Sequence, residues 1–168
     1  TKSILEKRYG IDPAKVDVVY NGVENGQVAR SADTDSGASA SASGDKIVLF
    51  LGRITMQKGP EYFVAAARMV LKKIDRVKFV MAGHGDKIAD VIDLAARHDI
   101  GHKILFTGFL RSAEVDRLFQ MADVFVMPSV SEPFGIVALE AISHDVPTII
   151  SKQSGVSEVL KHTLKVDF

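Results

Sequence analysis

The sequence predicts an α/β fold, a doubly wound parallel sheet with helices on both faces, and two observations lead to that prediction. From Lys46 onward, short continuous apolar runs alternate with amphipathic helical patterns. Strands that are apolar on both faces belong in a parallel sheet that helices cover on each side. The composition agrees, because 46% hydrophobic and 25% charged residues in a chain of 168 are typical of a globular domain with its own core.

The first 45 residues precede this alternating pattern and form two segments. Residues 1–28 are predicted to hold a helix, Ser3–Tyr9, and a strand, Lys15–Tyr20. Residues 29–45 are predicted to be a flexible loop, because Ser36–Gly44 contains only Ser, Ala and Gly. Such a stretch cannot bury enough surface to offset the entropy of ordering it.

The sheet domain is predicted to span residues 46–168 and to begin with the strand Lys46–Leu51, which ends at Gly52. Pro60 then opens a helix, because proline is favoured at the first helical position. This helix presents one apolar stripe at steps of three and four residues. The stripe consists of Phe63, Ala66, Ala67, Val70, Leu71 and Ile74. Val77–Ala82 is the next strand.

The alternation then continues along the rest of the chain. A helix over 86–98 precedes the strand Lys103–Thr107, and Ser112 is predicted to cap a helix that runs to Met121. The later elements are a strand at Val124–Met127 stopped by Pro128, a helix at Phe134–Ser143, a strand at Val146–Ile150 and a short helix near Val156–Leu160. Right-handed crossovers between parallel strands make the doubly wound topology the expected one.

In a doubly wound sheet, ligands bind beyond the carboxyl ends of the strands, where the strand order reverses. With the usual order, the first strand of the domain lies beside the fourth, so the loops 52–59 and 128–135 form the predicted site. The first loop offers Arg53, suited to a forked grip on phosphate oxygens, and Lys58, a mobile point charge. The second leads into a helix start, where backbone N–H groups attract anions. Together the two loops predict a pocket for a diphosphate. The alternative is that Arg53 and Lys58 are ordinary solvated surface charges.

Two carboxylates accompany these loops. Glu132 and Glu140 are eight residues apart, which is about 12 Å along a helix. That separation is wide for the carboxyl pair of a glycosidase, roughly 5–9.5 Å. It is the separation expected of two carboxylates that bind separated hydroxyl groups of one extended ligand. The alternative is that Glu132 is favoured by the helix dipole and Glu140 is solvated.

Other motifs and the composition exclude several classes of function. Gly83-His84-Gly85 follows a strand but lacks the third glycine of a dinucleotide fingerprint, so no nicotinamide cofactor is predicted. His98 and His102 indicate an exposed helix end, with no third ligand for a metal. A formal net charge of zero argues against nucleic acid as a partner. Apolar runs such as Ile47–Leu51 are too short for a membrane span, and the lack of cysteine fits a reducing, cytoplasmic location.

Three motifs follow one another along the chain. They are Gly52-Arg53 with Lys58-Gly59, Pro128-Ser129-x-x-Glu132-Pro133-Phe134-Gly135, and Glu140-Ala141, and Asn21-Gly22-Val23 stands ahead of them. Together they resemble the C-terminal half of the retaining glycosyltransferases of family four, group one, whose relatives include glycogen and sucrose synthases. The resemblance implies a GT-B fold, in which two Rossmann-like domains enclose a cleft. This half would hold a UDP-, GDP- or ADP-linked sugar without a metal or other cofactor.

The resemblance also implies roles for single residues. Arg53 and Lys58 would neutralise the diphosphate, Glu132 would contact the donor sugar as the third catalytic residue, and Glu140 would grip the ribose hydroxyls. The other implied substrate-binding residues are Gly52, Gly83, Gly85, Phe109, Leu110, Phe134, Gly135 and Ile136. In two places, Asp145 and Ser154, the family often has glycine instead.

The same resemblance implies that this is a piece of a longer enzyme. The acceptor-binding N-terminal domain is missing and the chain stops at Phe168, before the closing helices usual for this half. We therefore expect the piece to be inactive alone as a hexosyl-type transferase. Two other functions fit the same residues: a nucleotide-sugar 2-epimerase-like domain and a non-catalytic nucleotide-binding module.

Overall fold

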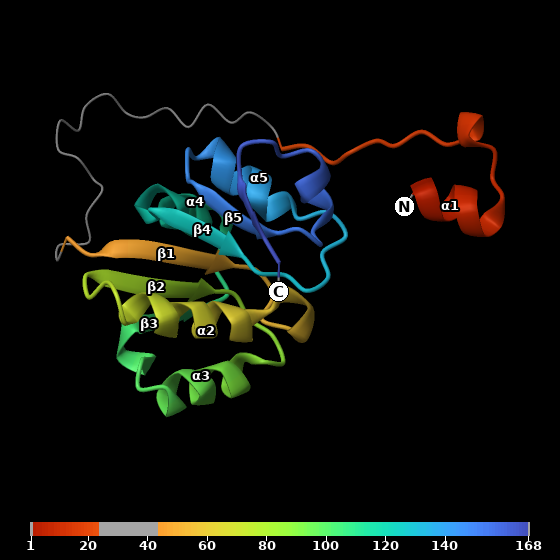
Figure 1. Ribbon diagram of the computed structural model, residues 1–168. Helices are drawn as coiled ribbons and strands as arrows, with labels where there is room; N and C mark the ends of the chain where they lie inside the picture. Colours follow the sequence, from red (N-terminus) through yellow and green to blue (C-terminus); the bar gives the residue numbers. More distant parts are fainter. Residues whose placement is uncertain (1, 24–43, 168) are drawn as a thin grey trace, which may run out of the picture.

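Strand β1 (Lys46–Leu51) lies at the centre of a six-stranded parallel sheet with the order β3-β2-β1-β4-β5-β6 (Figure 1). This is a computed structural model, and it describes residues 2–23 and 44–167. The other strands are β2 (Val77–Ala82), β3 (Ile104–Gly108), β4 (Val124–Met127), β5 (Thr148–Ser151) and β6 (Leu164–Val166). The strand order reverses between β1 and β4, as the doubly wound topology predicts, and this prediction is confirmed.

Helices cover both faces of this sheet. The helices are α1 (Lys2–Tyr9), α2 (Pro60–Leu71), α3 (Ile88–Arg97), α4 (Ser112–Met121) and α5 (Ile136–Ser143). Short 3-10 turns lie at Pro13–Lys15, Met56–Lys58, Gly101–Lys103 and Gly155–Glu158. Helices α2 and α3 lie on one side of the sheet and α4 and α5 on the other (Figure 1). None of the helices in the described parts of the chain is both long enough and apolar enough to span a membrane.

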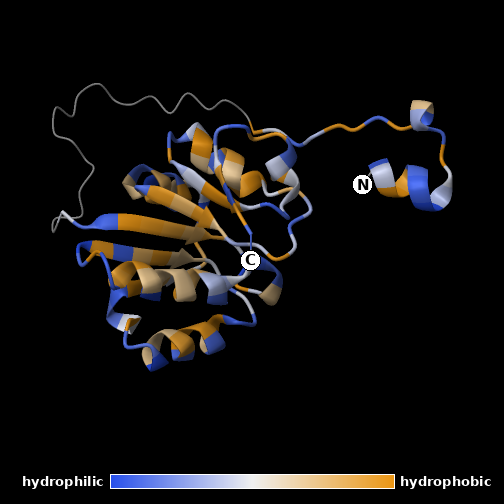
Figure 2. Cartoon of the chain, viewed as in Figure 1, coloured by the Kyte–Doolittle hydropathy of each residue, from blue (hydrophilic) through white to orange (hydrophobic). Residues whose placement is uncertain are grey.

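Alternation along the strands builds two separate cores. Ile47 and Leu49 of β1 join the core under α4 and α5, whereas Phe50 joins the core under α2 and α3. Successive side chains of a strand point to opposite faces, so a strand that is apolar throughout supplies both cores. Figure 2 shows hydrophobic colour along β1 after its hydrophilic first residue, with polar residues concentrated on the outer faces of the helices.

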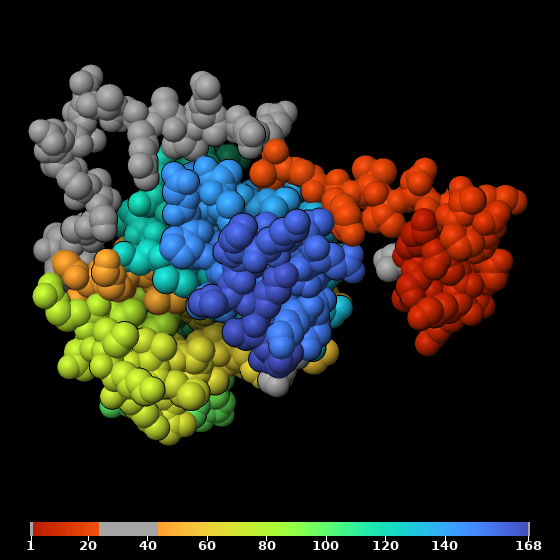
Figure 3. Space-filling model, turned by 45° about the horizontal axis from the view of Figure 1, so that its top comes forward, coloured from red at the N-terminus to blue at the C-terminus, as the bar shows by residue number. Residues whose placement is uncertain are grey.

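The predicted strand at Lys15–Tyr20 is wrong. Pro13–Lys15 forms a 3-10 turn, and residues 16–20 are irregular. Val19 is 90% exposed, because this segment leaves the sheet domain and α1 stands apart from it (Figures 1 and 3). A β-strand needs a partner for its backbone N–H and C=O groups, and an apolar sequence alone does not supply one. The predicted flexible loop at 29–45 lies, up to residue 43, outside the described residues.

Several predicted element details also change. Helix α2 ends at Leu71 and the chain then turns, which leaves Ile74 51% exposed outside the helical stripe. Ala66 is exposed as well, and Val64 is buried in its place. Ser112 is the first residue of α4 instead of its cap, and the Glu114 carboxylate accepts a 2.8 Å hydrogen bond from the N–H of Arg111. Strand β6, three exposed residues at the sheet edge, was not predicted from the sequence.

Candidate functional site

The loops that follow β1 and β4 lie against each other at the carboxyl edge of the sheet. The N–H groups of Val130 and Ser131 donate to the carbonyl oxygen of Gln57, at 2.9 and 3.2 Å. Gly59 adopts φ of 62°, and a side chain there would overlap the carbonyl oxygen of Pro128. A residue other than glycine would therefore separate the two loops. The convergence of the two loops, predicted from strand order, is confirmed.

Lys58 and Glu132 meet at this junction. The Nζ atom of Lys58 forms an ion pair with the Oε2 atom of Glu132. The two side chains are only 20% and 9% exposed, so water screens this pair far less than a surface pair. The backbone of Glu132 is held in turn, because its carbonyl oxygen accepts a 3.0 Å hydrogen bond from Gly155. The cation predicted for a diphosphate and the carboxylate predicted for a sugar are thus direct neighbours.

Arg53 is the second cation of this edge. Its backbone position is fixed on both sides, because Gly52 donates to the carbonyl oxygen of Ala82 and Ile54 donates to that of His84, each at 3.0 Å. Its side chain is exposed and makes no ion pair or side-chain hydrogen bond within residues 2–23 and 44–167. Unlike Lys58, Arg53 therefore keeps its guanidinium donors available to an anion.

The glycines after β2 allow the loops after β1 and β2 to approach each other closely. A side chain on Gly83 would overlap the carbonyl oxygen of Gly52, and one on Gly85 would overlap that of Ile54. The N–H of Gly83 donates to the carbonyl oxygen of Gly108 at 2.9 Å, which links the loop after β3 to the same edge. Four strand ends therefore form one connected surface, with the loops after β3, β2, β1 and β4 side by side.

Helix α5 opens onto this surface. Gly135 precedes it with φ of 102°, and a Cβ atom there would lie 2.8 Å from the Cε atom of Met127 and 3.2 Å from the Cγ atom of Glu132. No side chain caps the helix. The first N–H groups of a helix have no intrahelical acceptor, so those near Ile136 remain available to a ligand.

Phe134, next to the helix start, lies under an aromatic ring from the N-terminal segment. The ring centroids of Tyr20 and Phe134 are 6.2 Å apart, and the hydroxyl of Tyr20 donates to Glu158 at 3.0 Å. This hydrogen bond and the negative charge of Glu158 raise the pKa of Tyr20. The sequence analysis did not single out Tyr20, although its place just before Asn21-Gly22 was a signal.

Three other predicted residues lie farther along these elements. Glu140 is half-buried on α5, and its carboxylate makes no hydrogen bond or ion pair with the described part of the chain. Phe109 is 81% exposed beside the strand end at Gly108. Leu110 packs on the core under α4 and α5, so at least part of its side chain contributes to the packing of the fold.

A separate hollow lies away from this edge. It has a volume of about 640 Å³ and is lined by residues 142, 145–148 and 159–163, between the end of α5 and the start of β6. The predicted donor-binding residues are not among its lining residues. The candidate site therefore rests on the loop contacts and charges described above, and not on the size of a cavity.

The sheet order defines a Rossmann-like domain, a class of fold in which ligands usually bind at the carboxyl ends of the strands. The chain belongs to the family Glycosyl transferases group 1, whose match covers residues 31–165. It is 37% identical over 153 residues to an uncharacterized glycosyltransferase of Methanocaldococcus jannaschii. That alignment covers 88% of this chain and 39% of the relative, so the chain spans about two fifths of the relative's length.

Solved structures share the fold. The C-terminal domain of a group 1 glycosyl transferase from Francisella tularensis has a TM-score of 0.66 at 25% identity, over 74% of this chain and 68% of that one. The HepE protein of Anabaena in complex with UDP-glucose has a TM-score of 0.74 at 19% identity, over 95% of this chain and 46% of that one. The predicted family and the predicted fold, the C-terminal domain of a GT-B enzyme, are confirmed.

Proposed function

We propose that this chain is the nucleotide-diphosphate-sugar-binding domain of a retaining glycosyltransferase. The enzyme transfers a hexosyl-type group from a UDP-, GDP- or ADP-linked donor to an acceptor, which an N-terminal domain outside this chain holds. The observation that carries the proposal is the Lys58–Glu132 ion pair at the junction of the loops after β1 and β4. The UDP-glucose bound by Anabaena HepE, which has the same fold, supports a donor of this class.

The chemistry of the proposed site centres on the leaving group. Cleavage of the bond between the sugar and the phosphate builds negative charge on the departing diphosphate. Arg53, Lys58 and the N–H groups at the start of α5 stabilise that charge from positions that are set before the reaction. These groups supply the electrostatic stabilisation that a bound metal ion supplies in other enzymes. We therefore propose a metal-independent reaction, in the cytoplasm that the lack of cysteine favours.

The carboxylates hold the two ends of the donor. Glu132 contacts hydroxyl groups of the sugar, and its ion pair with Lys58 keeps it at the diphosphate end of the site. Glu140, without a partner in the described residues, binds the ribose hydroxyls. The remaining contacts come from the connected strand-end loops and the helix start, at Gly52, Gly83, Gly85, Phe109, Leu110, Phe134, Gly135 and Ile136.

Replacement of Arg53 by alanine tests the site. A hydrogen bond to a charged group contributes about 1.5–3 kcal/mol, so Arg53→Ala is expected to weaken nucleotide binding roughly ten-fold or more. The measurement is a calorimetric titration of the 168-residue chain and of the variant with UDP, GDP and ADP. The preferred nucleotide then reports the base of the donor.

The matched control is Arg97→Ala, which removes an exposed arginine from the last turn of α3. The control variant is expected to bind as the unmodified chain does. An unchanged dissociation constant for Arg53→Ala would remove Arg53 from the site. A folded chain that binds none of the three nucleotides contradicts the proposed function itself.

A further inference from the structure

The backbone pairing between β4 and β5 ends at Met127, and a side chain continues the connection beyond it. Pro128, the next residue, has no N–H group to donate. One residue further, the carbonyl oxygen of Ser129 accepts a 2.6 Å hydrogen bond from the hydroxyl of Ser151, the last residue of β5. Both serines are completely buried, so solvent does not compete for this bond. The hydroxyl thus holds the first part of the loop that carries Glu132.

Ser151 is held in turn by the residues that follow it. The hydroxyl of Ser154 donates to the carbonyl oxygen of Ser151 at 2.7 Å, and the N–H of Ser154 donates to the same oxygen at 3.2 Å. Ser154 is also buried. The hydroxyl of Ser129 has no partner among the described residues, so the connection reaches that residue through its carbonyl oxygen. Two side-chain hydrogen bonds therefore link the turn after β5 to the loop after β4.

The same turn also contacts the backbone of Glu132 and Phe134. The N–H of Gly155 donates to the carbonyl oxygen of Glu132 at 3.0 Å, and the N–H of Val156 donates to that of Phe134 at 2.6 Å. A side chain on Gly155 would overlap the carbonyl oxygen of Pro133, so the two segments are in direct contact. Together with the serine bond, these contacts hold the loop after β4 at three successive points along its backbone.

The serine bond differs from the other two because a side chain makes it. The bonds from Gly155 and Val156 are made by backbone N–H groups, which a substitution leaves in the chain. The bond from Ser151 depends on one hydroxyl group. Without that hydroxyl, the carbonyl oxygen of Ser129 would be buried without its donor, and the loop could gain a partner for it only by moving.

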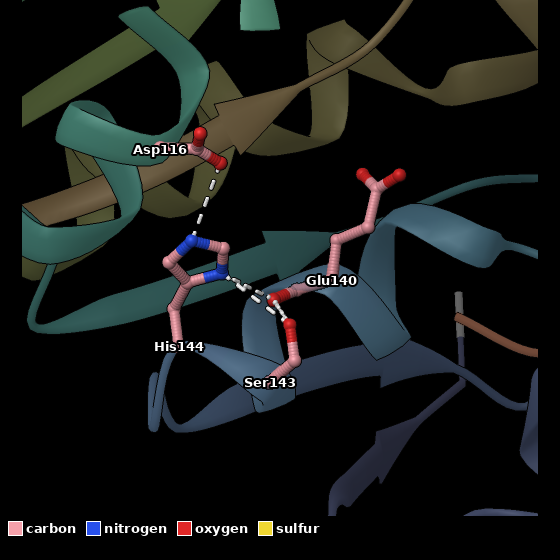
Figure 4. A network of polar contacts seen from close by, with 4 residues as sticks. All are labelled: Asp116, Glu140, Ser143 and His144. Atoms are coloured by element: carbon pink, nitrogen blue, oxygen red, sulfur yellow. Dashed lines mark hydrogen bonds and ion pairs between the residues drawn. The ribbon is translucent and has the colours of Figure 1, made fainter. Parts of the chain in front are cut away.

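Helix α5, which follows this loop, has separate contacts at its far end. The ring of His144, the C-cap residue, stacks on Phe119 of α4 with centroids 5.1 Å apart. Its Nδ1 atom lies 2.9 Å from the carbonyl oxygen of Glu140. Figure 4 shows the ring between Asp116 of α4 and the last turn of α5, with the carboxylate of Glu140 directed away from it. A change at Ser151 is therefore expected to leave Glu140 in place.

We propose that Ser151 is a positioning residue, which sets the place of the Glu132 carboxylate through its bond to the carbonyl oxygen of Ser129. The proposal rests on the proposed function, because it takes Glu132 as the group that binds the donor sugar and Glu140 as the group that binds the ribose. The serine bond holds the sugar end of the site, and the packing of α5 on α4 holds the ribose end.

The first experiment follows the loop without any ligand. Ser151→Ala removes the hydroxyl and adds no bulk. Hydrogen exchange is measured by NMR at the amides of Gly155 and Val156, which donate to the loop that carries Glu132. Relative to the amides of β1, their exchange is expected to become about five- to ten-fold faster in the variant. Unchanged relative exchange overturns the proposal.

The matched control is Thr148→Val, at the other end of the same strand. Thr148 is buried and its hydroxyl donates to the carbonyl oxygen of Val146 at 3.0 Å, so the control also removes one buried hydroxyl bond. It is expected to leave the relative exchange of Gly155 and Val156 unchanged. Equal acceleration by the two substitutions would show a general loss of stability and would overturn the positioning role.

The second experiment compares the two ends of the donor. The probes are the nucleotide preferred in the titration above (UDP, GDP or ADP) and its glucose derivative (UDP-glucose, GDP-glucose or ADP-glucose). Ser151→Ala is expected to weaken binding of the glucose derivative about five-fold and to change binding of the nucleotide by less than about two-fold. Thr148→Val is expected to bind both probes as the unmodified chain does.

Two results of this titration overturn the role of Ser151. One is a Ser151→Ala variant that binds both probes as the unmodified chain does, and the other is a variant that binds both more weakly by the same factor. A chain that binds neither probe contradicts the proposed function, and one that binds the nucleotide alone excludes glucose as the transferred sugar. In either case the exchange measurement still decides whether Ser151 holds the loop.

Discussion

Gly85 lies where the backbone after β2 crosses the backbone after β1. A side chain there would overlap the carbonyl oxygen of Ile54, which also accepts a 3.0 Å hydrogen bond from Lys87. The backbone angles of Gly85 are ordinary, so the requirement for glycine is one of space. This close approach is one of several contacts that hold the loops after β1 and β2 together.

Gly85→Ala is therefore expected to lower the melting temperature by about 4 °C or more, because overpacking against backbone costs about 1–3 kcal/mol. The matched control is Gly101→Ala, also at an ordinary backbone position, where the nearest atom to a Cβ would lie 3.9 Å away. The control is expected to leave the melting temperature unchanged or slightly higher, since alanine restricts the unfolded chain. Equal effects of the two substitutions, measured by thermal denaturation, would refute the steric account.

Asp145 and Ser154 show that one departure from the family pattern can have two different consequences. Asp145 adopts φ of 59°, a left-handed conformation that explains why glycine is common there, and aspartate tolerates it better than most residues. Ser154 has an ordinary φ of −76°. It is buried and its hydroxyl donates to the carbonyl oxygen of Ser151, at 2.7 Å. The first position has a backbone reason for glycine and the second does not.

At the scale of elements, the start of β1 is tied to the start of β4 by Asp123. Its carboxylate accepts hydrogen bonds from the Nζ atom of Lys46 and the N–H of Ile47, both at 2.8 Å. Ile47 accepts in return from the N–H of Asp123, at 2.9 Å. Partial burial works against the charged form, but the hydrogen bonds and the positive charge of Lys46 outweigh it, so the pKa of Asp123 is lowered.

Asp123→Asn is expected to lower the melting temperature at pH 7 by about 3–6 °C, since hydrogen bonds to a charged group contribute about 1.5–3 kcal/mol. A carboxyl group whose pKa is lowered by folding stabilises the protein above its unfolded value, about 3.9, and this contribution is lost as the pH falls through the folded value. The difference in melting temperature between the unmodified chain and Asp123→Asn is therefore expected to become smaller below about pH 4.

The control for this prediction is Asp90→Asn, at an exposed carboxylate in the first turn of α3. The pKa of Asp90 is lowered by its 2.8 Å hydrogen bond from Lys87, the residue that precedes the helix. Exposed pairs of this kind contribute little, so its melting temperature is expected to stay close to that of the unmodified chain. If Asp123→Asn lowers the melting temperature by the same amount at pH 7 and at pH 3.5, the carboxylate of Asp123 is not the stabilising group.

At the scale of the whole molecule, the sheet separates two cores that share no side chain. Phe63 of α2 packs with Phe50 and Phe79 below the sheet, at ring-centroid distances of 5.6 and 5.8 Å. Phe125 of β4 is completely buried in the other core and meets Phe119 of α4 at 6.0 Å. The two sets of aromatic rings therefore belong to different cores, on opposite faces of the sheet.

Phe63→Leu and Phe125→Leu are each expected to destabilise the fold by about 1–2 kcal/mol. Their effects should add to within about 0.5 kcal/mol in the double variant, because residues without shared partners act independently. The pair Phe63→Leu and Phe79→Leu, whose rings touch, is expected to depart from additivity. Urea denaturation measures the single variants and both double variants, and strong coupling between Phe63→Leu and Phe125→Leu would contradict the division into two cores.

Strands β1 to β5 and helices α2 to α5 were predictable because their patterns have a local cause. A strand that is apolar throughout and a helix with a repeating apolar stripe each follow from residues close in sequence. The same reasoning failed at Lys15–Tyr20, whose apolar residues match a strand but whose backbone pairs with no strand in the described structure. The local hydrophobic pattern shows which side chains a strand would bury. Whether the backbone of that strand is paired depends on segments that are distant in the sequence.

By itself, the sequence determined the α/β class and the family, because hydrophobic periodicity and three ordered motifs are written in neighbouring residues. It also predicted the placement of β1 beside β4, through the usual order of a doubly wound sheet. Only the tertiary structure decided that Lys58 pairs with Glu132 while Arg53 has no partner among the described residues, and that His144 bridges α4 and α5. These are contacts between side chains up to 74 residues apart in the chain. Their partners are set by how loops and helices pack, which no local pattern encodes.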